Sequence, residues 1–145
     1  MSGKKMKQAF LYLTIDDSPQ NLEVFTELSK GVEEFGDAYL LFHAEQGVPD
    51  TIKDYKNYTF TYETLHAMNY KMVNDTLVPY NVHFPILRFW HDNPQYDYYW
   101  VIEDDVRFNG DWHDFFDAYK DVHSDLLACH IRRFKEEPDW LFWLL

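Results

Sequence analysis

Residues 9–17 read AFLYLTIDD, an unbroken apolar run that ends in two acids. An apolar run without alternation is typical of a strand buried on both faces, as in a parallel sheet. Ser18 and Pro19 follow at once and predict a helix start, with serine as the N-cap and proline at the first helical position. The next apolar residues recur at steps of three and four up to Phe35, which indicates one buried helix face, and Gly36 is the predicted C-cap.

The rest of the chain repeats this alternation. We predict strands over residues 38–44, 58–62, 98–102 and 125–130, and helices over residues 64–73, 85–94 and from Asp111 onward. Strands alternating with helices indicate an α/β fold with a mostly parallel sheet and helices on both faces. Right-handed crossovers would place the second and third strands on one side of the first strand and the fourth on the other. The carboxyl ends of the first and fourth strands would then lie on either side of the topological switch point, the place where the strand order reverses. Ligands bind at this place in open parallel α/β sheets.

Composition narrows the class of protein. The 145 residues fit one domain over residues 1–145, and 46% hydrophobic with 19% aromatic content excludes a disordered chain. The net charge of −12 disfavours nucleic acid and anionic lipid as partners, so an anionic ligand would need a bound metal ion to reverse the local field. The first apolar run is too short for a signal sequence or a membrane span, and Cys129 is the single cysteine, so we expect a cytoplasmic protein.

The apolar end of the chain, residues 140–145, carries two expectations. Such a hexamer normally packs on something, so the chain is expected to be either the N-terminal part of a larger catalytic domain or a homo-oligomer that associates through this segment.

The sharpest chemical feature is the acidic triplet, Glu103, Asp104 and Asp105, directly after the apolar strand 98–102. Three adjacent carboxylates repel one another, and a divalent cation between them would relieve that repulsion. A hard cation takes oxygen ligands, and a diphosphate supplies the remaining ones. The simpler interpretation is a solvated strand end.

Residues 99–106, YWVIEDDV, resemble the acidic metal-binding motif of glycosyltransferases with the GT-A fold, in its Glu-Asp-Asp form. The resemblance implies a Rossmann-like nucleotide-diphospho-sugar transferase fold, with Mn²⁺ or Mg²⁺ as cofactor. Asp105 would contact the metal, while Glu103 and Asp104 would hold the ribose or the waters of the metal. The implied reaction moves a sugar from a nucleotide-sugar donor, a UDP-sugar above all, to a glycan or another hydroxyl acceptor.

The same resemblance assigns further residues. The ends of the first and second strands would contact the nucleotide, through Thr14, Asp16, Asp17 and His43. Asp17 is equally well explained as a helix cap, and His43 as part of a polar loop. His130, at the end of the last predicted strand, is the candidate general base or further metal ligand, although a hydrogen-bonded structural histidine is the commoner outcome.

Three other functions can be compared with glycosyl transfer. Residues 14–19 resemble the acidic motif of polysaccharide deacetylases, but no two of the seven histidines are four residues apart, as that metal site requires. A haloacid-type phosphohydrolase needs two aspartates with one residue between them at the end of the first strand, whereas Asp16 and Asp17 are adjacent. A non-catalytic nucleotide-sugar-binding module, or an incomplete transferase fragment, explains the absence of an identifiable base.

Overall fold

The computed structural model describes residues 6–74, 76–78, 81–128 and 132–140. Their helices and strands follow in chain order, with one short 3₁₀ helix, η1. The bounds are β1 Gln8–Thr14, α1 Pro19–Gly31, β2 Gly36–His43, η1 Asp50–Ile52, β3 Asn57–Phe60, α2 Tyr62–His66, α3 His83–Asp92, β4 Tyr98–Glu103 and α4 Trp112–Asp117.

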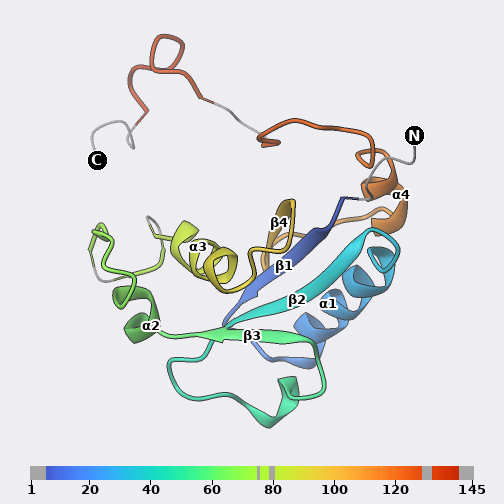
Figure 1. The fold of residues 1–145 in the computed structure, drawn as a ribbon, viewed down its shortest axis with the longest axis horizontal. Coiled ribbons are helices and arrows are strands. Elements are labelled where there is room, and N and C mark those ends of the chain that lie inside the picture. The colour runs from blue at the N-terminus through green and yellow to red at the C-terminus, as the bar shows by residue number, and fades with distance from the viewer. Residues whose placement is uncertain (1–5, 75, 79–80, 129–131, 141–145) are drawn as a thin grey trace.

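The sheet is entirely parallel across the described strands, in the order β3-β2-β1-β4 (Figure 1). The predicted α/β class and the predicted strand order are therefore confirmed, with β1 central and β4 on its far side. The pairing of β1 with β4 runs from Gln8 opposite Tyr98 to Leu13 opposite Glu103. This register ends both strands at the same edge of the sheet.

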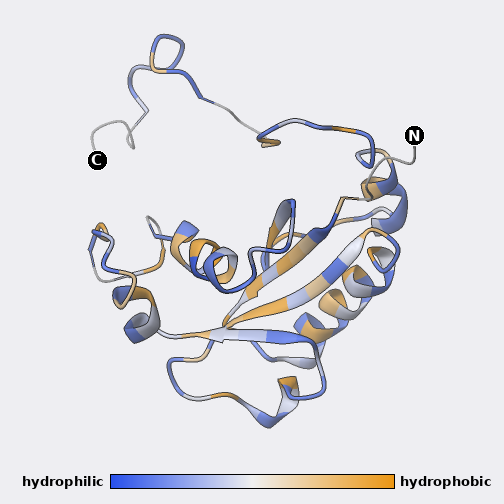
Figure 2. Cartoon of the chain, viewed as in Figure 1, coloured by the Kyte–Doolittle hydropathy of each residue, from blue (hydrophilic) through white to orange (hydrophobic). Residues whose placement is uncertain are grey.

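Helices cover both faces of the sheet, which gives the Rossmann-like layering that the sequence predicts. Phe10 and Tyr12 of β1 belong to one buried cluster with the apolar face of α1 and with Phe116 of α4. Leu11 belongs to a second cluster with Leu65 of α2 and with α3. Figure 2 shows β1 and β2 as mostly hydrophobic, as a strand buried on both faces must be.

The start of α1 is as predicted, but its end is not. Ser18 is the N-cap, its side chain accepts the N–H of Asn21, and Pro19 opens the helix. The helix ends at Gly31, and Gly36 begins β2 instead of capping α1. A Cβ at Gly36 would lie 2.1 Å from the carbonyl oxygen of Gln8, so glycine is required there by the close approach of β1 and β2.

Three other boundaries differ from prediction for local reasons. The third strand ends at Phe60, because Thr61 caps α2 and exchanges hydrogen bonds with Thr64 in a capping box. The helix predicted over residues 64–73 covers only Tyr62–His66, and Asn69 adopts a left-handed φ of 59° that a helix cannot continue through. Helix α3 begins at His83, two residues before the predicted start.

The strand predicted over residues 125–130 is wrong for residues 125–128, which are neither helix nor strand. A strand needs a hydrogen-bonded neighbour, and these residues do not pair with the outer edge of β4. Leu126 is 71% exposed, so this segment does not bury its apolar side chains against the sheet. The end of the predicted strand, with His130, lies outside the described residues, as does the apolar stretch 141–145.

Across the residues that can be placed, no helix combines the length and the apolar character needed to cross a membrane.

Candidate functional site

The carboxyl ends of β1 and β4 are joined by a side-chain hydrogen bond. The hydroxyl of Thr14 donates to Oδ2 of Asp104 over 2.5 Å, and the backbone N–H of Asp104 donates to the carbonyl oxygen of Leu13 over 3.1 Å. The sequence separates these groups by ninety residues. The structure therefore brings the first and fourth strand ends into one place, as the switch-point argument predicts.

A buried network beneath this contact fixes Thr14. Asn21 of α1 donates from Nδ2 to the Thr14 hydroxyl oxygen over 2.8 Å and to the carbonyl oxygen of Asp16 over 2.6 Å. The hydroxyl of Tyr12 donates to Oδ1 of Asn21 over 2.5 Å. Burial, and then the negative charge of Asp104, raise the pKa of Tyr12 to about 12, so it remains a neutral donor at physiological pH.

Asp16 and Asp17, two predicted nucleotide-binding residues, make local contacts in this structure. Asp16 accepts the backbone N–H of Ser18 over 2.9 Å and its hydroxyl over 2.8 Å, which orders the turn into α1. Asp17 accepts a hydrogen bond from the hydroxyl of Thr51 in η1. Both carboxylates therefore accept hydrogen bonds within the fold. Asp16 is nevertheless exposed, and Asp17 is half-buried.

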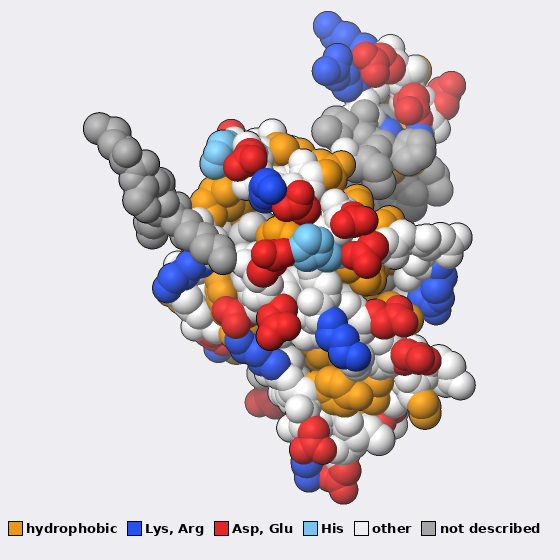
Figure 3. Space-filling model, turned by 90° about the vertical axis from the view of Figure 1, so that its right-hand side faces the viewer, with side chains coloured by type: hydrophobic (Ala, Val, Ile, Leu, Met, Phe, Trp, Pro, Cys, Tyr) orange, Lys and Arg blue, Asp and Glu red, His pale blue; other side chains and the backbone are white. Residues whose placement is uncertain are grey.

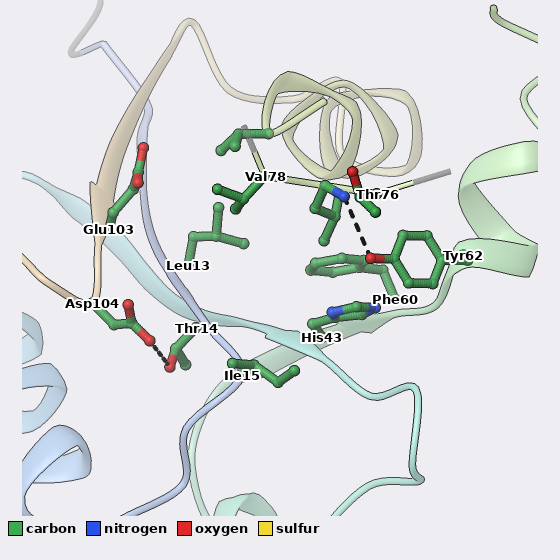
Figure 4. Close-up of a pocket in the computed structure, with 12 residues that line it drawn as sticks. Leu13, Thr14, Ile15, His43, Phe60, Tyr62, Thr76, Val78, Glu103 and Asp104 are labelled. Atoms are coloured by element: carbon green, nitrogen blue, oxygen red, sulfur yellow. Dashed lines mark hydrogen bonds between the residues drawn. The ribbon is translucent and has the colours of Figure 1, made fainter. Parts of the chain in front are cut away.

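The acidic triplet is spread over two sides of the strand end. Glu103 and Asp105 are exposed, and Asp104 is half-buried against Thr14. Figure 4 shows the Glu103 side chain pointing away from Asp104. Arg107 donates to the carbonyl oxygen of Asp104 over 2.6 Å and so fixes the turn that carries the triplet. The donor set is all carboxylate oxygen, the chemistry that Mg²⁺ and Mn²⁺ prefer, but its oxygens do not converge on one point.

A second acidic cluster lies at the start of α4 and begins six residues after the triplet. Among the residues described, Asp111, His113 and Asp114 are the group whose potential ligand atoms lie within 4.8 Å of one another. Asp111 is already used as the N-cap of α4, because its Oδ1 accepts the backbone N–H groups of His113 and Asp114. The imidazole of His113 pairs with Glu34, so local structure accounts for the cluster.

A pocket of about 340 Å³ opens beside the joined strand ends (Figure 4). Most of its walls are apolar or aromatic, and its acids are Glu103 and Asp104. The lining residues are Leu13, Thr14, Ile15, His43, Phe60, Tyr62, Thr76, Leu77, Val78, Val82, Glu103 and Asp104. A neighbouring, larger pocket of about 720 Å³ shares Ile15, His43 and Tyr62 with it and extends past Glu45 toward Pro49. Asp105 lines neither pocket.

His43 is the most unusual group in the pocket wall. Its side chain is 9% exposed, and its Nε2 is the buried side-chain atom, among those that can be described, that has no hydrogen-bond partner. Its nearest charged neighbour is Oε2 of Glu45, 3.4 Å away, and that oxygen also accepts the backbone N–H of Tyr62 over 2.9 Å. Leaving a buried polar atom unpaired costs about 1–3 kcal/mol, so such an atom in a pocket wall indicates a ligand-binding position.

Sequence reasoning missed the wall formed by residues 76–78. Asn81 is fully buried, and its amide holds this loop: Oδ1 accepts the N–H of Val73 over 3.0 Å, while Nδ2 donates to the carbonyl oxygens of Val73 and Thr76 over 2.8 and 2.6 Å. The hydroxyl of Tyr62 accepts the N–H of Leu77 over 3.3 Å. Periodicity carries no signal for such a loop, because its contacts are polar and irregular.

Acidic side chains, with basic ones between them, are distributed over the side of the molecule on which α4 lies (Figure 3). Among the residues that the structure describes, no Lys or Arg lines either pocket. His130, the candidate base, lies outside the residues that the structure describes.

The comparisons with known proteins are few. No curated protein and no solved structure matches the chain. A protein-family model described as "Protein of unknown function (DUF3405)" matches residues 42–125, which run from the end of β2 to beyond α4 and include His43, Tyr62 and the acidic triplet. The chain therefore belongs to the DUF3405 family, whose function is unknown.

Proposed function

We propose that this chain binds a nucleotide-sugar at the carboxyl edge of its sheet and is a metal-dependent glycosyltransferase. The observation that carries the proposal is the hydrogen bond from Thr14 to Asp104, which holds the end of β1 against the acidic triplet beside a pocket. Strand ends at a switch point are where open α/β sheets bind ligands. The resemblance of residues 99–106 to the GT-A acidic motif adds the substrate class, a UDP-sugar as donor and a glycan or other hydroxyl as acceptor.

The charges of the site support a requirement for a cation. Glu103 and Asp104 would repel a diphosphate, and neither pocket has a Lys or Arg among its described lining residues. Asp105 would contact Mn²⁺ or Mg²⁺, as the resemblance implies, and its side chain is exposed, as is that of Glu103. A cation bound there would bridge the diphosphate and neutralise the charge that develops on the leaving nucleoside diphosphate.

The residues of this chain then have separate tasks. Asn21 fixes Thr14, and Thr14 fixes Asp104, so one carboxylate of the triplet is held in place before any ligand arrives. Preorganised polar groups cost less to engage than mobile ones. The apolar walls exclude water from the part of the ligand that they enclose.

One observation favours the alternative, a non-catalytic nucleotide-sugar-binding module. Transfer to a hydroxyl needs a group that takes up its proton. Among the residues that line the two pockets, His43 is buried, and the acids are either at the cation end or committed to hydrogen bonds within the fold. A module that only binds the donor would need no base.

Thermal unfolding tests binding. The protein is melted alone, with UDP, with Mn²⁺, with both, and with both plus EDTA. Ligand at a hundredfold its Kd adds about 2.7 kcal/mol, which for a chain of this length raises Tm by about 5–11 °C. We expect the rise only with both components, lost with Asp105→Ala and kept with the exposed control Asp54→Ala.

Donor turnover separates the two functions. UDP release from a panel of UDP-sugars, with Mn²⁺ and simple hydroxyl acceptors, is measured for the wild type and for Asp105→Ala. Release that requires Asp105 supports the transferase, whereas binding without release supports the module. A protein that no nucleoside diphosphate stabilises, with or without metal, overturns the proposal.

A further inference from the structure

The outer edge of β4 is open. In the strand order β3-β2-β1-β4, β4 pairs with β1 and with no other strand of the described chain (Figure 1). Tyr98 and Asp104 donate their backbone N–H groups to carbonyl oxygens on the β1 side. Successive residues of a strand direct their backbone groups to opposite sides, so Tyr99, Val101 and Glu103 direct theirs away from β1. The N–H groups of these three residues have no hydrogen-bond partner within the part of the chain that the structure describes.

This edge lacks the features that usually protect an edge strand. Within β4 there is no Lys, Arg or Pro, and residues 98–102 are all aromatic or β-branched. The strand at the opposite edge, β3, is only four residues long, whereas β4 has six. The Val101 side chain is 39% exposed. Unpaired backbone groups on a strand of such composition form a template on which a further strand can pair.

A groove of about 320 Å³ lies at this edge. Residues 98–101 of β4 and residues 124–127 are among those that line it, so the later segment runs beside the strand but is separated from it by the groove. Leu126 is 71% exposed, and residues 124–127 form no hydrogen bond with any other described residue. This segment can therefore move away at little cost when a strand that does form hydrogen bonds pairs with β4.

We propose that the edge of β4 binds a second copy of this chain, so that β4 pairs antiparallel with the partner subunit's β4 and the two four-stranded sheets join into one. Such a contact uses the same edge in both copies and closes as a two-fold dimer. It covers the backbone groups that each copy alone leaves unpaired. The inference does not depend on the proposed function, because it uses the open edge of the sheet and not the pocket at the strand ends.

Backbone alternation and charge together select the register of the two strands. Outward-facing groups can meet outward-facing groups only if the two-fold axis passes through a residue position and not between two residues. An axis at Trp100 would place Glu103 opposite the partner subunit's Asp97, and like charges directly opposite each other destabilise a strand pair. An axis at Ile102 would leave only residues 101–103 of each strand paired.

An axis at Val101 avoids both problems. Val101 then lies opposite the partner subunit's Val101, and Glu103 lies opposite the partner subunit's Tyr99. Trp100 lies opposite the partner subunit's Ile102, and an aromatic residue opposite a β-branched one is a favourable cross-strand pair. No acid lies opposite another acid within the paired strands, and the acids that flank β4 lie beyond the paired residues. The strand is therefore complementary to itself, which is why we assign a second copy of the chain as its partner.

Analytical ultracentrifugation of the full chain over a range of concentrations tests the association. We expect a weak, concentration-dependent dimer, because pairing along one short edge buries less area than most stable interfaces do. Val101→Pro removes an outward N–H that one copy alone does not use, and it should weaken the dimer about tenfold or more. Val101→Lys keeps the N–H but brings two positive charges together at the axis, and it should also weaken the dimer. Val106→Lys is the control, since Val106 is 41% exposed but lies beyond the strand.

A disulfide tests the register. Cys129 is the single cysteine, so Val101→Cys is made together with Cys129→Ser. Directly opposite residues of an antiparallel pair have Cα atoms about 4.5–5.5 Å apart, which is within the range that a disulfide bridges. We expect Val101→Cys to give a covalent dimer on mild oxidation, and Val106→Cys in the same background to remain uncrosslinked. An axis at any other residue would shift the two Val101 positions past each other along the strands and prevent the bridge.

The Tm of each variant shows whether it is folded, and if Val101→Pro is not, Val101→Lys decides the result. A dimer that is weakened by substitution of Val101 and cross-linked through Val101→Cys supports the inference. A wild type that stays monomeric at every concentration overturns it. A dimer that folded Val101→Pro and Val101→Lys leave intact also overturns it, because the copies must then meet through another surface. If the dimer depends on Val101 but Val101→Cys does not cross-link, the antiparallel register is wrong.

Discussion

Thr14 of β1 and Asp104, the residue after β4, lie 2.5 Å apart through their side-chain oxygens, and both belong to the wall of the same pocket. The hydroxyl oxygen of Thr14 also accepts a hydrogen bond from Nδ2 of Asn21 over 2.8 Å, while the O–H of Thr14 donates to Asp104. Thr14 therefore connects the buried face of α1 to the acidic strand end. A substitution there should affect both stability and ligand binding.

Thr14→Val removes the hydroxyl and nearly keeps the shape of the side chain. We expect the free energy of unfolding to fall by about 1–2 kcal/mol, because Asp104 loses a donor and Asn21 loses an acceptor in a buried place. Urea denaturation measures this loss. Thr26→Val is the matched control, since the Thr26 hydroxyl donates only to the carbonyl oxygen of Leu22 one turn back in α1, and its loss should change stability by less than about 0.5 kcal/mol. Equal losses in the two variants would mean that the Thr14–Asp104 contact contributes nothing specific.

The two acidic clusters should respond differently to substitution. Asp111 caps α4 through two backbone N–H groups, so Asp111→Ala should cost about 0.5–2 kcal/mol of stability. It should leave the effect of Mn²⁺ on UDP binding unchanged, because the proposed cation lies at the triplet. Asp105→Ala should do the reverse, with little loss of stability and loss of the metal effect. Calorimetric titration with UDP, in the presence and absence of Mn²⁺, measures the affinity of both variants. If Mn²⁺ fails to increase the affinity of Asp111→Ala but still increases that of Asp105→Ala, the cation site lies at α4.

Asn81→Asp should disrupt the pocket wall. The side-chain amide donates to the carbonyl oxygens of Val73 and Thr76, and a buried carboxylate in its place would face these oxygens with like partial charge. We expect a loss of more than about 2 kcal/mol at pH 7 and faster proteolysis between residues 73 and 81. Lowering the pH should recover part of the stability, because a protonated acid regains one donor. Asn69→Asp is the control, because Asn69 is exposed and aspartate tolerates its left-handed φ. Normal stability of Asn81→Asp would show that the loop does not depend on this amide.

The ion pair between Asp37 and Lys56 should make a small, acid-sensitive contribution to stability. The hydrogen bond from Lys56 lowers the pKa of Asp37 below its usual 3.8, and the hydroxyl of Tyr96, which donates over 2.8 Å, lowers it further. A carboxyl group whose pKa is lower in the folded state stabilises the fold at every pH above its unfolded pKa, and that contribution disappears as the pH falls through the folded pKa. Both charged side chains are about half exposed, so we expect only about 0.2–1 kcal/mol.

Asp37→Asn tests this contribution by urea denaturation from pH 7 to pH 2. The variant should be less stable than the wild type at pH 7. The difference should begin to shrink near pH 3.8, the usual pKa of the group, and vanish only below the lowered pKa of the folded state. Asp54→Asn, at an exposed position, should show no such convergence. A difference between Asp37→Asn and the wild type that persists unchanged to pH 2 would mean that the charge of Asp37 is not its cause.

The strand order could be predicted from the sequence, but several boundaries could not. The apolar run of β1 predicts a strand in the centre of the sheet, because a continuous apolar stretch is typical of a strand buried on both faces, and β1 is buried along most of its length. The helix expected over residues 64–73 was wrong because Met68 and Met72 pack in the core without being helical, and a spacing of three or four residues does not distinguish the two. Gly36 was assigned to the wrong element for a similar reason, since the need for glycine came from Gln8 on another strand.

Part of the candidate site could likewise be predicted from the sequence, and part could not. Thr14, His43, Glu103 and Asp104 were all expected from their places at strand ends, and the structure puts all four in one pocket. Asn81, which holds the loop that closes the pocket, had no pattern to reveal it. Its role depends on backbone groups that only the folded chain brings within reach.

The sequence by itself determined the parallel sheet, its strand order and the acidic end of β4, because burial of apolar runs and the hand of the crossovers leave few alternatives. Only the tertiary structure decided that Asp104 faces Thr14, that Glu103 points elsewhere, and that Nε2 of His43 is left without a partner in a pocket wall. The physical reason is that apolar burial follows a local period along the chain, whereas hydrogen bonds between side chains depend on distances and directions that are set when distant elements pack together.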